Sequence, residues 1–278
     1  MDSILVTGSN GFIGRKIVER LPKSKVLTDS VNSTRINLEN IDEVLKIESS
    51  DIVIHLGGKT PKKDLEWKDY FHNNISSTIN ILEYCVAKKV KKLIYVSSYV
   101  YGKPEYVPID EKHPINPHNA YTESKYLGER LCKFYCEQNE LDVIILRPFN
   151  VYGESMNQGF FLSNLINSIK TDKKISIVNK ESKRDFLHID DFVDLILKII
   201  SYECKFEIFN VGAGISFSFE DIIKKIENFT SKIFNLEFSQ DKEIFIADIC
   251  ADISKIQKKI NWKPKIEFDE GLRRMLRV

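Results

Sequence analysis

The sequence predicts an α/β fold built on a doubly wound parallel sheet, with a smaller mixed α/β region toward the C-terminus. Through the first half of the chain, short apolar segments alternate with longer amphipathic ones. The short segments are apolar on both faces, as in strands that helices cover on either side. A glycine-rich stretch follows the first apolar segment and opens an amphipathic one, which is typical of such sheets.

Five segments of the first half have the composition of buried parallel strands: 3–7, 25–28, 51–55, 92–97 and 142–147. Amphipathic periodicity between them predicts helices, most clearly over 74–88 and 121–138. After residue 147 the alternation loosens, and we predict helices at 159–169, 190–201, 219–229 and 252–260 and strands at 175–178 and 207–211. We therefore expect a sheet domain over residues 1–150 and a second region, interleaved with it, over residues 151–278.

The bulk composition excludes several classes of partner. The 278 residues include 41 basic and 40 acidic side chains, a net charge of +1, so neither nucleic acid nor an anionic membrane is expected as a partner. The first residues lack a signal-peptide pattern, and no apolar run approaches the roughly 20 residues that span a bilayer. Five scattered cysteines suit a reducing compartment, so we expect a cytoplasmic protein.

Two of these cysteines, Cys132 and Cys136, lie one helical turn apart. This spacing could be half of a metal site, but no His or Cys partner lies nearby in sequence. We predict that both thiols pack in the core and that the chain holds no metal.

The glycine-rich stretch, Thr7 to Gly14, reads TGSNGFIG and is predicted to bind a dinucleotide. Gly8 would allow the tight turn, Gly11 the approach of the backbone to a pyrophosphate, and Gly14 close packing of helix on strand. The diphosphate would then lie on free N–H groups at the helix N-terminus, where the helix dipole favours negative charge. The residues expected to form this part of the cofactor site are Gly8, Asn10, Gly11, Phe12, Ile13 and Gly14.

Asp29 ends the second predicted strand, where a carboxylate can accept hydrogen bonds from the adenosine ribose. It would repel a 2′-phosphate, which favours NAD over NADP. Asp29 could instead be a simple turn residue, and Arg35 is close enough in sequence to pair with a 2′-phosphate. NADP therefore stays open as the alternative cofactor.

Tyr121 and Lys125 lie four residues apart and so share one face of a predicted helix. A tyrosine with an ordinary pKa near 10 needs help to act as a base at neutral pH, and a neighbouring ammonium favours the phenolate. Lys125 could also hold the nicotinamide ribose. Ser97 ends the fourth predicted strand, where ligands of doubly wound sheets bind, and could hydrogen-bond the substrate oxygen. We therefore predict that Ser97, Tyr121 and Lys125 are catalytic.

An ordered set of motifs now carries a family resemblance: TGSNGFIG, IHLGG, SSYVYG, YTESK, RPFNVYG, RDFLHIDD, FNVGAG and INWKPK. In this order they resemble the extended short-chain dehydrogenases, the NAD-dependent epimerase/dehydratase family that acts on nucleotide sugars. The resemblance covers nearly the whole chain and implies a Rossmann-type first domain and a substrate-binding second region.

The resemblance also assigns further residues. It implies that the cofactor is lined by Asn37, Leu38, Leu56, Gly57, Gly58 and Asn74, with Asn74 supporting the active site. The family more often has alanines at the positions of Gly57 and Gly58 and an Asp at Asn37. Substrate contacts are expected from Ser98, Asn150 and Arg184, the last pairing with the nucleotide diphosphate, unless it is a surface arginine that pairs with Asp185 or Asp190. His188 is expected to be structural.

Members of such a family divide by reaction. Dehydratases carry an Asp-Glu pair after the catalytic hydroxyl, but Ser98 and Tyr99 stand there, so dehydration is disfavoured. An epimerase and an NADPH-dependent 4-keto-6-deoxysugar reductase need the same triad. Asp29 favours the NAD-dependent epimerase, whereas the short stretch between the second and third strands favours the reductase. We expect a nucleotide-sugar epimerase.

A non-catalytic dinucleotide-binding regulator is the alternative from another class. Such a protein is expected to lose part of the Tyr, Lys and Ser set, and this chain keeps all three. The helices at 74–88 and 121–138 are those through which similar enzymes dimerise, so a homodimer is expected.

Overall fold

A computed structural model of the chain describes residues 2–31, 34–62, 65–240 and 247–277. It divides into two compact units, each assembled from separated stretches. Unit 1 comprises Met1–Gly102, Ile115–Pro148 and Leu195–Phe209, and unit 2 comprises Lys103–Pro114, Phe149–Asp194 and Asn210–Val278. The chain passes from unit 1 to unit 2 after Pro148, close to the boundary predicted at residue 150. The sequence did not predict that residues 103–114 belong to unit 2 or that residues 195–209 belong to unit 1.

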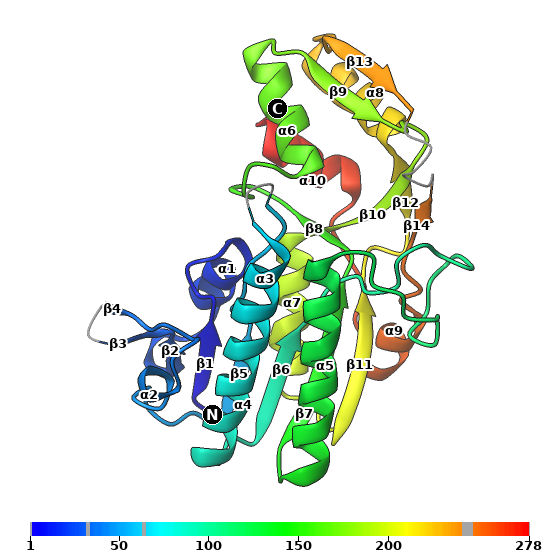
Figure 1. Cartoon of the computed structure of the whole chain (residues 1–278). Helices are drawn as coiled ribbons and strands as arrows, with labels where there is room; N and C mark the ends of the chain where they lie inside the picture. The colour runs from blue at the N-terminus through cyan, green and yellow to red at the C-terminus, as the bar shows by residue number, and fades with distance from the viewer. Residues whose placement is uncertain (1, 32–33, 63–64, 241–246, 278) are drawn as a thin grey trace. The chain divides into compact units, whose positions relative to one another are not determined.

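Unit 1 is built around a six-stranded sheet with the order β11-β7-β6-β5-β1-β2 (Figure 1). The strands are β1 (Ile4–Thr7), β2 (Val26–Thr28), β5 (Ile52–His55), β6 (Lys92–Val96), β7 (Asp142–Pro148) and β11 (Phe206–Val211). Neighbours from β2 to β7 pair in parallel. The five predicted strands are confirmed. The placement of 207–211 in the second region was wrong in part, because most of β11 completes this sheet.

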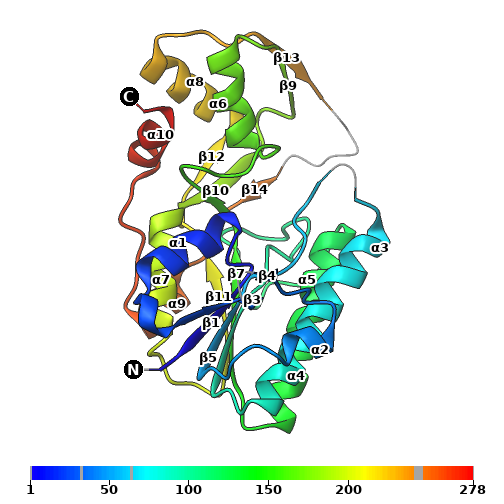
Figure 2. The same ribbon diagram turned by 90° about the vertical axis from the view of Figure 1, so that its left-hand side faces the viewer.

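Helices cover both faces of the sheet, as a doubly wound fold requires. Figure 2 shows α1 (Phe12–Arg20) on one face and α2 (Ile41–Val44), α4 (Ser76–Ala87) and α5 (Ala120–Gln138) on the other. Asn119 caps α5: its side chain accepts from the Thr122 N–H, and the Thr122 side chain bonds back to Asn119. Among the described residues, no helix is both long and apolar enough to cross a membrane.

The core beneath α4 and α5 is formed by apolar side chains of the strands and by cysteines. Cys85, Cys132 and Cys136 belong to this cluster, together with Leu93 and Tyr95 of β6. All five cysteines of the chain are free thiols, and the described residues contain no metal-ligand cluster. The predicted packing role of Cys132 and Cys136 is confirmed.

The helical segment before α4 is irregular. A short α3 (Trp67–Tyr70) continues into a π-helical turn, η2 (Phe71–Ile75), and then into α4. Such a turn widens the helix by one residue and often marks a functional site. The remaining small elements of this unit are η1 (Lys23–Lys25), β3 (Ser30–Val31) and β4 (Thr34–Arg35).

Unit 2 is smaller and mixed, as predicted. Its strands are β8 (Asn150–Tyr152), β9 (Ile175–Val178), β10 (Lys183–His188), β12 (Ser216–Ser218), β13 (Leu236–Ser239) and β14 (Asp248–Ile249), and its helices are α6 (Phe161–Thr171), α8 (Phe219–Thr230), α9 (Ser254–Ile260) and α10 (Phe268–Leu276). Helix α7 (Ile189–Ile199) begins here and ends in unit 1. Strand β10 pairs with β8 and β14 in parallel and with β12 in antiparallel. Side chains of α6, α8 and α10 form the core.

Helix α10 was missed in the sequence, where the helix at 252–260 was predicted to be the last. Gly271 lies in its middle, and glycine lowers helix propensity. The structure gives the reason for the glycine: a Cβ there would lie 2.2 Å from the Tyr152 hydroxyl. Close packing onto β8 therefore outweighs local propensity.

Candidate active site

The glycine loop after β1 has the compact form that the sequence predicts. Gly8 has a φ of +69°, which favours glycine, and the Gly11 N–H donates to the Gly8 carbonyl at 2.9 Å. A Cβ on Gly14 would lie 2.2 Å from that same carbonyl oxygen. Asn10 is exposed at the tip, and Phe12 and Ile13 open α1. The glycines leave a backbone cradle at the helix N-terminus, which fits a dinucleotide diphosphate.

Asp29 is buried, with 1% of its surface exposed, and is hydrogen-bonded to this loop. Its carboxylate accepts hydrogen bonds from the Gly8 N–H at 3.0 Å and from the Ser9 N–H at 3.3 Å and hydroxyl at 2.5 Å. The sequence predicted a ribose contact and did not foresee this role. Oδ1 accepts both Ser9 hydrogen bonds and Oδ2 accepts one from Gly8, so Oδ2 keeps one lone pair for a ribose hydroxyl.

The cofactor residues predicted after β5 lie next to Leu38, one of those predicted after β2. Gly57 leaves room for Leu38, because a Cβ on Gly57 would lie 2.5 Å from the Leu38 Cδ1. The Gly57 N–H donates to the Thr7 hydroxyl at 3.2 Å, which ties the ends of β1 and β5 together. Leu56 is partly buried, and Gly58 and Asn37 are exposed. These residues adjoin the glycine loop at the sheet's switch point, where doubly wound folds bind ligands.

Asn74 lies in the π-helical turn and connects it to α5. Its side-chain amide donates to the Ser124 hydroxyl at 2.9 Å, and its carbonyl oxygen accepts from the Lys59 N–H at 2.7 Å. Ser124 in turn donates to the Tyr121 carbonyl at 2.7 Å. The buried Asn74 therefore fixes the first turn of α5, where Tyr121 lies.

Tyr121 is in that first turn of α5, where the helix dipole favours negative charge on the phenol. The Ser98 hydroxyl interacts with the phenol, and Tyr70 packs edge-on against the ring, with 6.1 Å between the ring centroids. Burial raises the pKa of Tyr121, while the Ser98 hydrogen bond opposes this rise. Lys125 is not among the groups that shift the pKa of this phenol.

The reason is the position of Lys125. Its ammonium lies over the Tyr95 ring, 4.5 Å from the centroid, and the side chain is 5% exposed. Burial lowers the pKa of Lys125 to about 8, which the neighbouring Cys132 and Glu129 partly oppose. A buried lysine with so low a pKa is typical of a functional site.

Ser97 does not face the phenol in the structure. It is 3% exposed, and its hydroxyl donates to the Glu129 carboxylate at 2.5 Å. Strand β6 explains this: alternate residues Leu93 and Tyr95 face the α5 side, and Ser97 continues that face. Ser97 therefore lies away from the phenol, whereas Ser98, which was predicted to contact the substrate, interacts with it.

Glu129 is also paired with Arg147, which the sequence analysis did not single out. The Arg147 guanidinium donates to Glu129 at 2.6 Å and to the Tyr101 hydroxyl at 2.8 Å. All three side chains are buried. One signal was available, because Glu129 follows Lys125 by four residues on the same helix face and Arg147 interrupts an apolar strand.

Unit 2 holds the remaining predicted substrate residues. The Asn150 amide on β8 donates to the Asp185 carbonyl at 2.9 Å. Arg184, on the paired strand β10, donates to the carbonyls of Lys183 at 2.8 Å and Ala247 at 3.2 Å. Its guanidinium lies 5.4 Å from the Phe219 ring centroid. Both side chains are partly exposed.

Asp185, also on β10, was not predicted to matter. Its carboxylate accepts the N–H groups of Ala213 at 2.6 Å, Gly214 at 2.9 Å and Ala251 at 3.1 Å. Burial raises the pKa of Asp185 to about 6, although these three N–H donors favour the ionised form. Asp185 therefore fixes the loop after β11 next to the strand that carries Arg184.

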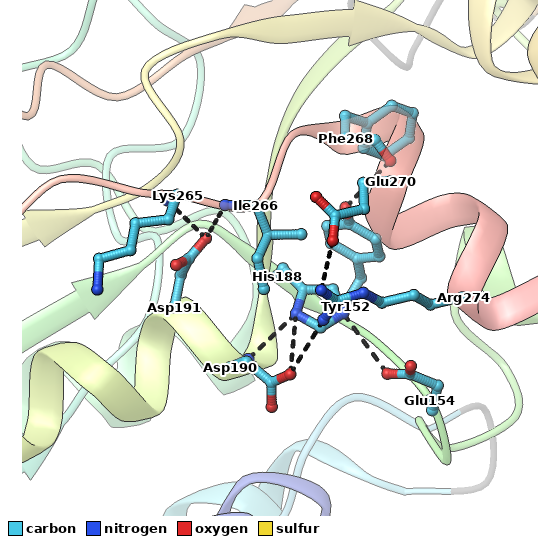
Figure 3. A network of polar contacts seen from close by, with 10 residues as sticks. All are labelled: Tyr152, Glu154, His188, Asp190, Asp191, Lys265, Ile266, Phe268, Glu270 and Arg274. Carbon is cyan, nitrogen blue, oxygen red and sulfur yellow. Dashed lines mark hydrogen bonds and ion pairs between the residues drawn. The ribbon is translucent and has the colours of Figure 1, made fainter.

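His188 has the structural role that was expected. Figure 3 shows its buried ring between Glu154 and Asp190: Nδ1 accepts the Asp190 N–H at 3.2 Å, and Nε2 lies 3.5 Å from the Glu154 carboxylate. Arg274 of α10 pairs with Asp190 at 3.4 Å. Burial lowers the pKa of His188, so the ring is neutral and joins α10 to the start of α7.

Comparison with known proteins identifies the family of the chain. Residues 4–212 match the NAD dependent epimerase/dehydratase family. A UDP-glucuronate 4-epimerase from Thermodesulfobacterium geofontis is 30% identical, with 99% of this chain and 95% of that protein covered. The dTDP-4-dehydro-6-deoxyglucose reductase of Escherichia coli is 25% identical over 99% of this chain and 97% of its own length.

Among solved structures, the UDP-glucuronic acid 4-epimerase from Bacillus cereus, in complex with UDP-glucuronic acid and NAD, superposes with a TM-score of 0.87. It is 26% identical and covers 99% of this chain and 98% of that one. The fold is thus of the Rossmann type, and the glycine cradle stands where the sequence placed it. The chain belongs to the NAD dependent epimerase/dehydratase family.

Proposed function

We propose that the protein is a nucleotide-sugar 4-epimerase that holds NAD at the glycine loop and exchanges a proton with the substrate through Tyr121. The observation that carries this proposal is the placement of Tyr121 in the first turn of α5, with Ser98 interacting with its phenol and the buried Lys125 one turn farther along the helix. The UDP-glucuronate and UDP-glucuronic acid epimerases named above support the substrate class, and the family description supports NAD.

The chemistry that bound NAD would supply is reversible acceptance of a hydride, and its positive ring would favour the phenolate. Tyr121 takes the proton of the sugar 4-hydroxyl as the hydrogen on C4 leaves as hydride, which gives a 4-keto sugar. Ser98 donates a hydrogen bond to the developing carbonyl oxygen. Tyr121 would return the proton to the oxygen when bound cofactor gives the hydride back to the opposite face of the ketone, which would invert C4.

Dehydration stays disfavoured when Ser98 replaces Ser97 as the catalytic hydroxyl. The two residues that follow Ser98 are Tyr99 and Val100, and neither is a carboxylic acid. Elimination from the sugar needs an acid and a base directly after the catalytic hydroxyl. Both are missing whether that hydroxyl belongs to Ser97 or to Ser98.

We also propose that Asn150 and Arg184 bind the nucleotide diphosphate. Arg184 is charged at all physiological pH values and suits a bidentate contact with phosphate. The backbone carbonyls of Lys183 and Ala247 hold part of its guanidinium, which fixes the side chain before substrate binds. Asp29 would accept the adenosine ribose hydroxyls, and its charge favours NAD; Arg35, exposed on β4, is the residue through which NADP would bind instead.

The test uses the purified full-length protein. Native mass spectrometry should find NAD retained, and a panel of UDP-sugars should show one that is epimerised at C4 without added cofactor. Tyr121→Phe should lower kcat by about 1,000-fold, within the range of a lost acid–base group, and still bind NAD. An empty protein that oxidises NADPH with 4-keto sugar nucleotides would be the reductase, and NAD binding without turnover by the wild type would indicate the regulator.

We propose further that the chain is a cytoplasmic homodimer that pairs through α4 and α5. These helices expose apolar side chains, among them Val86, 41% exposed, and Phe134, 58% exposed. Five cysteines, none of them in a disulfide, suit a reducing compartment. Light scattering should give twice the chain mass, and Phe134→Asp should give a monomer, whereas Trp67→Asp, outside α4 and α5, should remain dimeric. A wild-type chain of monomeric mass would refute the dimer.

A further inference from the structure

We propose that Ser97 and Glu129 are positioning residues of the reaction, which act through Ser98 and Lys125. This inference rests on the proposed function. The Ser97 hydroxyl donates to the Glu129 carboxylate at 2.5 Å, and Arg147 holds the other side of that carboxylate at 2.6 Å. Ser97, Glu129 and Arg147 are each less than 5% exposed, so none can contact a sugar.

The first action concerns Ser98. The Ser97 N–H donates to the Leu146 carbonyl at 2.8 Å, so both the backbone and the side chain of Ser97 are fixed at the end of β6. Its immediate neighbour Ser98 lies beyond the end of the strand and reaches the Tyr121 phenol. Because Glu129 and Tyr121 belong to the same rigid helix, the Ser97–Glu129 contact sets the distance between Ser98 and Tyr121.

The second action concerns Lys125. Tyr95 of β6, His55 of β5, and Cys132 and Glu129 of α5 all interact with its ammonium. Burial raises the pKa of Tyr95 and of Cys132 well above their ordinary values and lowers that of His55 to about 3. These three groups are therefore neutral at pH 7, and Glu129, one turn beyond Lys125 on α5, is the carboxylate among the neighbours that favour the charged form of Lys125.

Arg147 makes this arrangement possible. Buried charges need an opposite charge and hydrogen bonds close by. Arg147 supplies both to Glu129 through a bidentate contact, and the Tyr101 hydroxyl occupies a further donor of Arg147. The network thus holds the Glu129 carboxylate at a defined place between β6 and α5.

A double-mutant cycle tests the action on Ser98. Ser98→Ala should lower kcat by about 100-fold or more, and Ser97→Ala by about tenfold with KM unchanged. If Ser97 acts through Ser98, the double variant should be no slower than Ser98→Ala. Multiplied losses in the double variant, or a larger loss for Ser97→Ala than for Ser98→Ala, would overturn the proposal.

The action on Lys125 is measured without any substrate, so its failure is distinct from failure of the proposed function. In protein labelled with ¹³C at lysine Cε, the Lys125 signal, identified by its loss in Lys125→Met, should titrate with a midpoint of about 8. Glu129→Gln should lower this midpoint by about one pH unit. An unchanged midpoint would contradict the proposal.

Two further variants serve as controls for this measurement. Glu137→Gln removes an exposed carboxylate two turns farther along the same helix and should leave the Lys125 midpoint unchanged. Should Glu129→Gln fail to fold because Arg147 is left unpaired, Glu129→Gln combined with Arg147→Gln removes both charges together. Arg147 is not among the groups that shift the pKa of Lys125, so the midpoint should fall in this double variant too.

Discussion

Replacing Lys125 by methionine should inactivate the protein and stabilise it at the same time. Burial lowers the pKa of Lys125 from 10.5 to about 8. At about 1.4 kcal/mol per pH unit, this depression means that holding the charged ammonium in the folded state costs about 3 kcal/mol at neutral pH. The cation–π contact with Tyr95, which methionine loses, offsets about 1 kcal/mol. We expect Lys125→Met to gain about 2 kcal/mol.

The sign of the pH dependence follows from the lowered pKa. Between about pH 8 and pH 10.5 the unfolded chain still holds the proton that the native Lys125 has lost, so the stability of the wild type rises with pH across this window. The advantage of Lys125→Met should therefore be present in full below about pH 8. It should shrink and disappear as the pH approaches 10.5.

Urea unfolding and thermal melting at pH 7 and pH 9.5 measure this difference. A gain of about 2 kcal/mol at pH 7 corresponds to a rise in Tm of about 4 to 6 °C for a chain of this size. Lys133→Met, exposed on the same helix, is the control and should change stability little. A Lys125→Met variant that is less stable than the wild type at pH 7, or whose gain is independent of pH, would refute the reasoning.

Three further variants test the loops and the packing. Gly14→Ala places a Cβ 2.2 Å from the Gly8 carbonyl and should cost about 1 to 3 kcal/mol in melting experiments and weaken NAD binding, whereas Gly11→Ala, with a contact of 3.1 Å, should cost clearly less stability. Asp29→Ala leaves buried N–H groups of the loop without an acceptor and should weaken NAD binding at least tenfold by calorimetry; unchanged affinity would contradict the loop-holding role. Gly271→Ala should destabilise the chain by about 2 kcal/mol because its Cβ would meet the Tyr152 hydroxyl, and the neighbouring exposed Glu270→Ala should not.

The sheet of unit 1 was predicted well because the composition of each strand is enough to identify it as a buried strand. Runs such as residues 52–54 are apolar throughout, which is typical of a strand covered on both faces. The glycine loop was equally readable, since each glycine has a separate steric reason that depends on its immediate neighbours.

The catalytic serine could not be chosen in the same way. Ser97 and Ser98 are adjacent and chemically identical, and which one reaches Tyr121 depends on where β6 ends and on which face residue 97 continues. Asp29, Asp185 and Glu129 pose the same difficulty. Their partners are backbone N–H groups or side chains from distant parts of the sequence. No pattern of neighbouring residues predicts such contacts.

The order in which the sheet of unit 1 is assembled has a consequence for synthesis of the chain. β11 is translated more than fifty residues after its neighbour β7, once the Phe149–Asp194 stretch of unit 2 has been made. Until then a nascent chain carries β7 as an open edge with unpaired backbone groups, which is where intermolecular association begins. A fragment that ends near residue 150 keeps this open edge permanently, so the chain is expected to yield aggregates when truncated there and soluble protein when produced whole.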